Sequence, residues 1–384
     1  MIPILRKISA TLFLTLLAAS PAFAQEATIT VKKSDAINIA LKPFAGNDGG
    51  LAGKIVANDL DLSGVFSIGV PERSTYSVGG TAAGGSLQGI VTDIRGSVVL
   101  QKTYSGNTRQ CAHQFSDDIV ETLTGTKGIA TSKIAFVSNR SGAKEIYIAD
   151  YDGANAVQVT RDGAISVAPA ISPDGSKVAY TGYQSGYADI YTIDLSTGAR
   201  SRILKFPGTN SGASFSPEGG RIACTLSRDG NPELYIASAN GGGANRLTRT
   251  SGVESSPTWS PSGNEIIFSS DDRGGPQLFR ISAAGGSPRL VPTGYGYSTE
   301  PSWSADGTKV AFTARQGGFN IALVDLASGM TRILAQGQDP AFGPNSRHVI
   351  YSDGSSLVLL DTVKGRRTPI VTGLGKVSEP SWSR

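Results

Sequence analysis

Four acidic residues stand shortly before a recurring motif in the second half of the chain, a proline followed two residues later by an aromatic residue. They are Glu254, Glu300, Asp339 and Glu379. Carboxylate oxygens bind divalent cations, and clustered carboxylates attract basic protein surfaces. If the fold gathers these side chains, they form either a cation site or the charged part of a binding surface.

Other residues that could do chemistry are few. The sequence contains no Gly-x-Ser-x-Gly, His-Glu-x-x-His, Cys-x-x-Cys or phosphate-binding glycine loop. Its two histidines, His113 and His348, fall on an expected helix and at the start of an expected strand, and we interpret both as structural. Residues 150–155 have some features of a calcium loop but lack its distant glutamate, so we interpret them as a turn. We expect no catalytic residue, no metal site and no cofactor.

The acidic residues belong to a sequence repeat. Its copies begin at Pro169, Ala213, Pro257, Pro301, Pro340 and Pro380. The steps between them are 44, 44, 44, 39 and 40 residues. Turns of the type Ser-Pro-Asp-Gly preset the φ of proline, let Asp bond the backbone and end on a glycine that tolerates positive φ. Each turn joins two strands of alternating apolar residues, and two further strands complete each copy. A period near forty with four strands predicts the blades of a β-propeller.

The repeat begins out of phase. Residues 133–138 match the second strands of later copies, so the first blade lacks its innermost strand. The truncated copy at residues 380–384 can supply it. We therefore expect a six-bladed propeller over residues 132–384, closed by its C-terminal strand without a free sheet edge. The six innermost strands should run in one direction, so the loops that enter them ring one mouth, which the four acidic residues make acidic.

Residues 25–131 lack the repeat and mix helical and strand patterns. The expected order is strand, helix, three strands and helix, with strands at 37–41, 65–68, 87–92 and 98–104. Leu51, Ile55, Val56 and Leu60 share one face of the first helix, and Thr108 could cap the second. The expected fold class is thus an all-β six-bladed β-propeller preceded by a small α/β domain.

Residues 1–24 have the pattern of a secretory signal peptide. Arg6 and Lys7 precede an apolar run that is too short to span a membrane, and small residues predict cleavage after Ala24. The mature chain keeps 33 basic and 31 acidic side chains. This balance gives no footprint for nucleic acid. We expect an exported monomer without a membrane span.

Several motifs resemble the TolB family, the periplasmic component of the Tol-Pal envelope system. They are the signal peptide, Leu-Thr-Gly-Thr-Lys-Gly at 123–128, Ala-Asp-Tyr-Asp-Gly at 149–153 and the Ser-Pro-Asp-Gly repeats. The match covers nearly the whole mature chain. One departure is that the family usually has a further helix and strand between the positions of residues 71–73 and 76–78, which here nearly abut. The first domain is therefore a shortened version.

The resemblance implies a non-catalytic adaptor that supports outer-membrane integrity and constriction of the envelope at cell division. Its propeller would receive Pal, the peptidoglycan-associated lipoprotein, on the loops that enter the innermost strands. The residues expected to contact Pal are Ser166, Val167, Thr209, Asn210, Gly212, Glu254, Ser255, Ser256, Thr299, Glu300, Gln338, Asp339, Ser378 and Glu379. The family often has a histidine where Thr209 stands, so one contact is altered. An acidic mouth would favour a basic patch on the partner.

The resemblance also implies that the segment after the signal peptide binds the inner-membrane protein TolA. The residues expected to contact TolA are Glu26, Thr28, Ile29, Thr30 and Val31. A short β-prone segment can add to the edge of a partner's sheet. Equally, it can pair with the strand at 37–41 of its own domain.

Two other functions stay open at the level of sequence. A few carboxylates and amides at the tops of the blades could hold a cation, as in a metal-dependent hydrolase or lactonase that works in a propeller channel. Simple capture of a small ligand is the other alternative. Fold alone does not separate these functions from protein binding.

Overall fold

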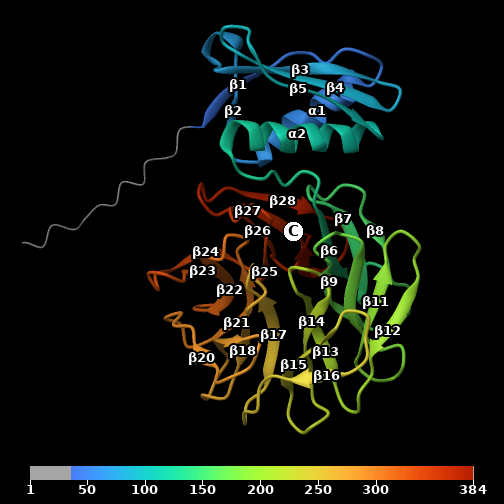
Figure 1. Ribbon diagram of the computed structural model, residues 1–384, viewed down its shortest axis with the longest axis vertical. Helices are drawn as coiled ribbons and strands as arrows, with labels where there is room; N and C mark the ends of the chain where they lie inside the picture. Colours follow the sequence, from blue (N-terminus) through green and yellow to red (C-terminus); the bar gives the residue numbers. More distant parts are fainter. Residues whose placement is uncertain (1–35, 384) are drawn as a thin grey trace, which may run out of the picture. The chain divides into compact units, whose positions relative to one another are not determined.

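The computed structural model describes residues 36–383. A five-stranded sheet with two helices comes first, and six four-stranded antiparallel sheets follow, each of which is one blade (Figure 1). The predicted fold class, a six-bladed β-propeller preceded by a small α/β domain, is confirmed. No helix within residues 36–383 is long and apolar enough to cross a membrane.

The small domain is a mixed sheet with both helices on one face. Its elements are β1 (Ile37–Leu41), α1 (Gly49–Leu62), β2 (Phe66–Ile68), the 3₁₀ turn η1 (Pro71–Arg73), β3 (Tyr76–Ala83), β4 (Ser86–Asp93), β5 (Val98–Ser105) and α2 (Thr108–Thr124). The strand order is β2-β1-β3-β4-β5, and β1 is parallel to both of its neighbours. Val56, Leu60, Phe115 and Ile119 of the helices pack against the sheet, where they are fully buried.

Two local predictions for this domain were wrong. Strand β3, in the middle of the sheet, was not predicted, because Gly79, Gly80 and two alanines give it a weak strand signal. Gly80 is needed there, since a Cβ atom on it would lie 2.3 Å from the carbonyl oxygen of Gln88. The N-cap of α2 is Asn107, not Thr108, because the Asn107 side chain accepts a 2.9 Å hydrogen bond from the N–H of Gln110.

Each blade is a four-stranded meander. The propeller strands are β6 (Lys133–Ser138), β7 (Glu145–Asp150), β8 (Val157–Gln158), β9 (Ser166–Ile171), β10 (Lys177–Gly182), β11 (Asp189–Asp194), β12 (Arg200–Leu204), β13 (Asn210–Phe215), β14 (Arg221–Leu226), β15 (Glu233–Ser238), β16 (Ala244–Arg246), β17 (Glu254–Trp259), β18 (Glu265–Ser270), β19 (Gln277–Ser282), β20 (Arg289–Leu290), β21 (Ser298–Trp303), β22 (Lys309–Arg315), β23 (Phe319–Asp325), β24 (Thr331–Gln336), β25 (Gln338–Phe342), β26 (His348–Ser352), β27 (Leu357–Asp361), β28 (Arg367–Val371) and β29 (Val377–Trp382). The inner strands, which begin the blades, are β9, β13, β17, β21, β25 and β29.

Apolar side chains fill the spaces between the blades. Trp259, Trp303 and Trp382 end three inner strands and are at most 5% exposed. They are core residues, and loss of such a side chain typically costs about 3–5 kcal/mol. Cys111 in α2 and Cys224 in β14 are both buried and free.

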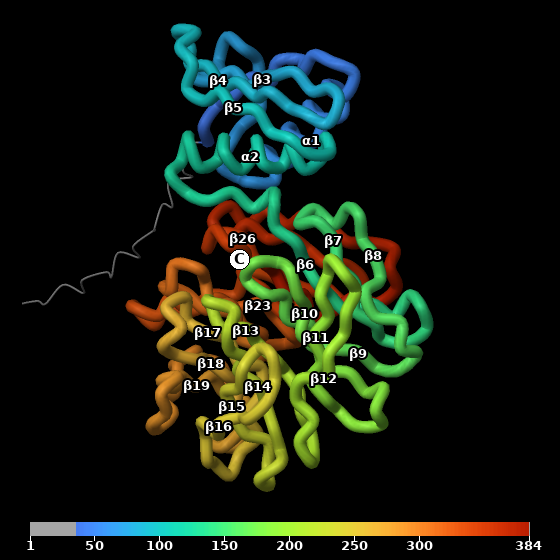
Figure 2. Tube along the Cα trace, turned by 45° about the vertical axis from the view of Figure 1, so that its right-hand side comes forward, coloured from blue at the N-terminus to red at the C-terminus, as the bar shows by residue number. Residues whose placement is uncertain are grey.

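The last strand shares a blade with the first propeller strand. β29 pairs antiparallel with β6, and the sheet order of this blade is β29-β6-β7-β8. The C-terminus accordingly lies near β6 (Figure 2). The Trp382 indole donates a 2.6 Å hydrogen bond to the Ser132 hydroxyl. Ser383 donates its N–H to the carbonyl of Lys133 at 2.9 Å and accepts the Lys133 N–H on its hydroxyl at 2.9 Å. Chain residues 250 positions apart thus complete one sheet.

Candidate functional site

The six inner strands begin at one end of the propeller, which we call the mouth. The predicted contact residues lie there, but most of them are among the first three residues of the inner strands and do not belong to loops. Thr209 and Gln338 are exposed at the mouth. The partly buried members are Val167, Gly212, Ser255, Ser256, Thr299, Glu300, Asp339, Ser378 and Glu379.

Three of the predicted residues do not reach the surface. Ser166, Asn210 and Glu254 are the first residues of their strands and have an exposed fraction of 0%. Asn210 is used internally, because its side chain donates to the Phe206 carbonyl at 2.8 Å. The prediction that these side chains contact a partner is corrected: they hold the strand starts in place.

Every inner strand contains a β-bulge at its second or third residue. The strand register shifts at this point in all six blades. The bulge residue has a positive φ in each case, at Ala168 (49°), Gly212 (63°), Ser256 (51°), Glu300 (53°), Asp339 (57°) and Glu379 (53°). In five blades a proline follows, and its missing N–H suits a point where ladder bonding is interrupted. The six bulges therefore form a ring of constrained backbone around the channel.

The bulges and the residues that follow them line a cavity of about 360 Å³ in the channel. Its only charged lining residues are Glu300, Asp339 and Glu379, from three consecutive inner strands. The lining contains no histidine, cysteine, lysine or arginine within the described part of the chain. The cavity is thus an acidic pocket without a cationic side chain in its wall.

The three carboxylates accept hydrogen bonds from the backbone of the next blade. Asp339 donates its N–H to Glu300 Oε2 at 3.1 Å, and Glu379 donates its N–H to Asp339 Oδ2 at 2.9 Å. Ala168 donates its N–H to Glu379 Oε2 at 2.6 Å. Thr313 adds a hydroxyl donor to Glu300 Oε2 at 2.6 Å. Each side chain thereby ties its bulge to the bulge of its neighbour.

Burial and the nearby charge of Asp339 make two of these groups, Glu300 and Glu379, weaker acids. Burial, together with the charge of Asp339, raises the pKa of Glu300 to about 8. Burial also raises the pKa of Glu379, although the Ala168 N–H and the charge of Lys144 act in the opposite direction. Glu300 is therefore mostly protonated at neutral pH, which reduces the negative charge of the channel.

Glu254 takes part in a different arrangement inside the blade wall. It accepts hydroxyl hydrogen bonds from Thr250 at 2.7 Å and Ser270 at 2.8 Å. Its other oxygen faces the carboxyl group of Glu233, which also receives Arg246 at 2.7 Å. Burial and the hydrogen bond with Glu233 raise the pKa of Glu254 to about 7, so the two carboxyls share a proton at neutral pH. The expectation that Glu254 makes the mouth acidic is wrong.

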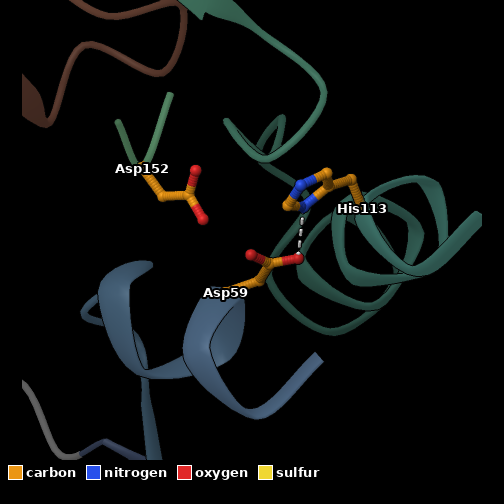
Figure 3. A group of neighbouring side chains, drawn as sticks. All are labelled: Asp59, His113 and Asp152. Atoms are coloured by element: carbon orange, nitrogen blue, oxygen red, sulfur yellow. Dashed lines mark hydrogen bonds and ion pairs between the residues drawn. The ribbon is translucent and has the colours of Figure 1, made fainter. Parts of the chain in front are cut away.

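A second acidic cluster, which we call the seam, joins the small domain to the propeller. Asp59 of α1, His113 of α2 and Asp152 of the β7–β8 turn present ligand-type atoms within 4.8 Å of one another (Figure 3). His113 Nδ1 lies 2.8 Å from Asp59 Oδ2, and the Tyr151 hydroxyl donates to Asp59 Oδ1 at 2.8 Å. Arg109 of α2 donates to Asp152 at 2.5 Å.

Further ion pairs extend the seam. Asp150 accepts from Arg109 and Lys133, both at 2.7 Å. Burial alone would raise the pKa of Asp150, but these two cations outweigh it and lower the pKa to about 2. Because the seam carboxylates already have protein donors, we interpret the cluster as a structural link and not as a metal centre. Residues 150–155, predicted to be a turn, form this link.

The two histidines lie away from the channel cavity. His113 is 4% exposed and is held by Asp59, with the edge of its ring toward Tyr151 at 5.8 Å. His348 begins β26 and is fully buried beside Asn345. Burial lowers the pKa of His348 to about 4, so it is neutral at pH 7. Neither side chain is placed to act on a molecule in the channel.

The residues predicted to bind TolA, Glu26 to Val31, lie outside the described residues. Sequence reasoning also missed the seam, although its most specific word, Asp-Tyr-Asp-Gly, was noted as a family motif. The bulge ring was missed too. The sequence did contain a signal for the bulges. In five blades the bulge residue stands directly before the proline of the repeat, so position relative to this proline, and not acidic character, marks equivalent residues.

The chain is similar to known TolB proteins. The PD40 family model, described as the TolB beta propeller domain, matches residues 120–384. The chain is 34% identical to a protein TolB homolog of Chlorobium chlorochromatii over 38% of this chain and 42% of that protein. It is 43% identical to the Tol-Pal system protein TolB of Geobacter metallireducens over 27% of this chain and 24% of that protein. The chain thus spans less than half the length of these curated relatives.

A solved structure matches over a greater length. TolB from Acinetobacter baumannii superposes with a TM-score of 0.82 and 29% identity, and the match covers 91% of this chain and 97% of that one. The likeness therefore includes the small domain as well as the propeller. Since the matched family model also spans more than half of the sequence, the chain belongs to the TolB β-propeller family.

Proposed function

We propose that this protein is a non-catalytic periplasmic adaptor of the Tol-Pal system, which binds Pal at the mouth of its propeller and TolA through its N-terminal region. In this role it supports outer-membrane integrity and constriction of the envelope at cell division. Membership of the TolB propeller family supports the proposal, as does the similarity to a relative named as a Tol-Pal system protein.

The observation that carries the proposal is the bulge ring around the mouth. Six equivalent bulges hold the strand starts in a fixed geometry, and hydrogen bonds link four of them in series, from Glu300 through Asp339 and Glu379 to Ala168. Loops between blades extend from this rigid base. Variable loops on a fixed scaffold are the usual way in which propellers bind other proteins.

The chemistry of the channel supports a role without catalysis. The cavity lining offers no histidine, cysteine or lysine that could act as a nucleophile or base in the described chain. Its three carboxylates are tied to backbone N–H groups of the neighbouring bulges. An arrangement that fixes the backbone is typical of a scaffold.

Calorimetry with Pal from the same organism tests the mouth. Thr209 and Gln338 are exposed, so Thr209→Glu with Gln338→Glu adds bulk and negative charge there without disturbing the core. We expect saturable binding by the wild type and at least tenfold weaker binding by this variant. Ala284→Glu with Met330→Glu is the matched control, because both residues are exposed in turns at the opposite end of the blades. No saturable heat for the wild type, or equal binding by both variants, would overturn the proposal.

The TolA part of the proposal concerns residues 26–31. Removal of residues 25–33 should abolish TolA binding and leave the melting temperature unchanged. Lost stability with intact TolA binding would instead mean that the segment pairs with the sheet of its own domain.

Mass spectrometry of the exported protein checks the proposed periplasmic location and cleavage after Ala24.

An enzyme in the channel is the alternative that these measurements must exclude. A thermal-shift titration with Ca²⁺, Mg²⁺ and Zn²⁺ and a panel of ester and lactone substrates provide the test. Turnover that saturates with substrate and disappears in Glu300→Gln would overturn the non-catalytic assignment.

A further inference from the structure

The exposed charges at the mouth are unevenly distributed. One sector, formed by the blade β29-β6-β7-β8 and the following blade β9–β12, carries exposed basic side chains that we call the basic arc. They are Arg140, Lys144, Arg161, Lys205 and Lys376. None of the five forms a salt bridge with any residue between 36 and 383. Asp162, the largely buried acid next to Arg161 in sequence, is already paired with Arg200.

Backbone hydrogen bonds show that the turns of the basic arc are neighbours in space. Asn139, next to Arg140, donates its N–H to the carbonyl of Lys376 at 3.2 Å. Ser166 donates its N–H to the carbonyl of Lys144 at 2.8 Å. Asn210 donates its N–H to the carbonyl of Ala188 at 3.0 Å, which brings the segment after Lys205 against the β10–β11 turn of the same blade. The arc is thus one continuous surface.

Three large apolar side chains are exposed within the basic arc. Ile165 is 48% exposed, Tyr183 is 40% exposed and Tyr187 is 70% exposed. Tyr183 donates its N–H to the carbonyl of Ile165 at 2.9 Å, so these side chains lie on adjoining turns. Apolar and aromatic residues surrounded by charged ones are the usual anatomy of a protein-binding hot spot.

The rest of the mouth, from Arg228 onward, differs in charge balance. It carries basic and acidic residues in equal number, namely Arg228, Arg249, Arg273 and Arg315 together with Asp229, Asp271, Asp272 and Asp353. Arg228 pairs with Asp229 at 3.4 Å and also covers the rings of Phe206 and Tyr235. A balanced surface of this kind has little preference for the charge of a partner.

The basic arc begins at the edge of the channel. The charge of Lys144 acts on Glu379, one of the three carboxylates of the cavity. The basic arc therefore borders the acidic cavity on the side of Lys144. The carboxylates Glu300, Asp339 and Glu379 are only partly exposed, whereas the five basic side chains of the arc are exposed.

From this distribution we propose that the basic arc, with Tyr183 and Tyr187 at its centre, is the main docking sector of the mouth, and that the partner presents an apolar contact ringed by carboxylates. This inference rests on the proposed function, in which the partner is Pal. It replaces the expectation from sequence that an acidic mouth selects a basic partner. Unpaired arginine and lysine side chains speed the encounter with an acidic surface. Added salt screens this attraction and weakens binding.

Charge reversal in each sector tests the proposal. Lys144→Glu with Arg161→Glu reverses two charges of the basic arc, and Arg249→Glu with Arg273→Glu makes the same change in the balanced sector. All four side chains are exposed, so both variants should fold. For Pal binding at low salt we expect at least tenfold weakening in the arc variant and less than threefold in the control. Added salt should weaken wild-type binding and have little effect on the arc variant.

A second pair of variants tests the aromatic centre. Tyr187→Ala removes a side chain that is 70% exposed, and Met330→Ala removes one that is 69% exposed in the turn that precedes β24, at the opposite end of the blade. We expect about tenfold weaker Pal binding for Tyr187→Ala and no change for Met330→Ala. Equal effects of the two substitutions would overturn the inference.

The outcomes separate the two proposals. If the wild type does not bind Pal, the proposed function fails and this inference falls with it. If the wild type binds and the arc variant binds equally well, the inference alone is overturned. Vesicles of phosphatidylethanolamine and phosphatidylglycerol test an anionic membrane surface as the occupant. Loss of vesicle binding with unchanged Pal binding in the arc variant would also overturn the inference.

Discussion

The channel and the seam both gather carboxylates, but they neutralise them differently. At the seam, Asp59, Asp150 and Asp152 receive side-chain donors from arginine, lysine, histidine and tyrosine. In the channel, Glu300, Asp339 and Glu379 receive mainly backbone N–H groups, and no cation lines the cavity. The pKa of Asp150 is accordingly lowered, whereas the pKa values of Glu300 and Glu379 are raised.

This difference indicates a structural role for the seam and leaves the channel carboxylates with uncompensated charge. Side-chain ion pairs and hydrogen bonds at the seam hold the small domain and the propeller together and engage all three of its carboxylates. Backbone donors in the channel fix the bulges without fully compensating the negative charge. Stability that depends on pH should therefore have opposite signs in the two regions.

The largest effect is expected at the seam. Asp59→Ala leaves the Tyr151 hydroxyl and His113 without their buried partner, so it should lower the free energy of unfolding by about 3 kcal/mol. Asp61→Ala is the matched control, because Asp61 is 51% exposed and its pair with Arg366 is worth about 0–1 kcal/mol. Urea denaturation followed by circular dichroism measures both. Equal stability of the two variants would refute the structural role of the seam.

The channel should lose stability as pH rises. Glu300 has a folded pKa of about 8 and an ordinary unfolded pKa near 4.5, so the folded state holds the extra proton between these values. The contribution of Glu300 to the free energy of unfolding is therefore most favourable at low pH and falls as pH rises from about 4.5 to about 8. Glu300→Gln removes the titration and should be about 2 kcal/mol more stable than the wild type near pH 9, relative to their difference near pH 6.5. Parallel stability curves for the two proteins across this range would show that Glu300 ionises normally.

The seam should lose stability as pH falls. Asp150 has a folded pKa of about 2 and an unfolded value near 3.8, so its contribution is complete above the unfolded value and disappears as pH falls through about 2. Asp150→Asn should cost about 1–2 kcal/mol at neutral pH and nothing near pH 2. Thermal unfolding over this pH range measures the difference. A deficit that persists unchanged in acid would assign the effect to packing and not to charge.

The smallest effect concerns the carboxyl pair inside the blade wall. In the preceding blade, Asp189 and Asn210 occupy the positions of Glu233 and Glu254 and are hydrogen-bonded to each other. Glu254→Gln recreates this pairing of a carboxylate with an amide and removes a group whose pKa is about 7. The variant should gain about 1 kcal/mol above pH 8 and nothing near pH 5. Glu233→Gln is the control, since it deprives Arg246 of its ion pair and should destabilise at both pH values. A stabilising effect of both substitutions would contradict the proton-sharing arrangement.

The propeller could be predicted from sequence because its signal is repeated. Each Ser-Pro-Asp-Gly-like turn is weak evidence alone, but five turns at a regular spacing leave few alternatives. The small domain had no such repetition. Its central strand β3 was missed because the glycines that permit close packing against Gln88 also remove the strand signal.

The candidate sites were harder to predict than the fold. Glu254 was grouped with Glu300 because both are acidic and stand near a proline, yet they lie at different offsets from it and face different environments. The seam joins Asp59 to Tyr151 across 92 positions of the chain, and no local pattern predicts such a contact. The basic arc likewise arises only when separate turns are brought together by the fold.

The pairing of β29 with β6 has a consequence for the timing of folding. A chain that is still being synthesised has its first propeller strands long before it has the last one, because the partners are 250 residues apart. Until β29 arrives, β6 is an open sheet edge that can pair with another molecule. Contacts this distant in sequence form slowly, so the ring should close late in folding. Chains that end early would therefore be prone to aggregate as well as less stable.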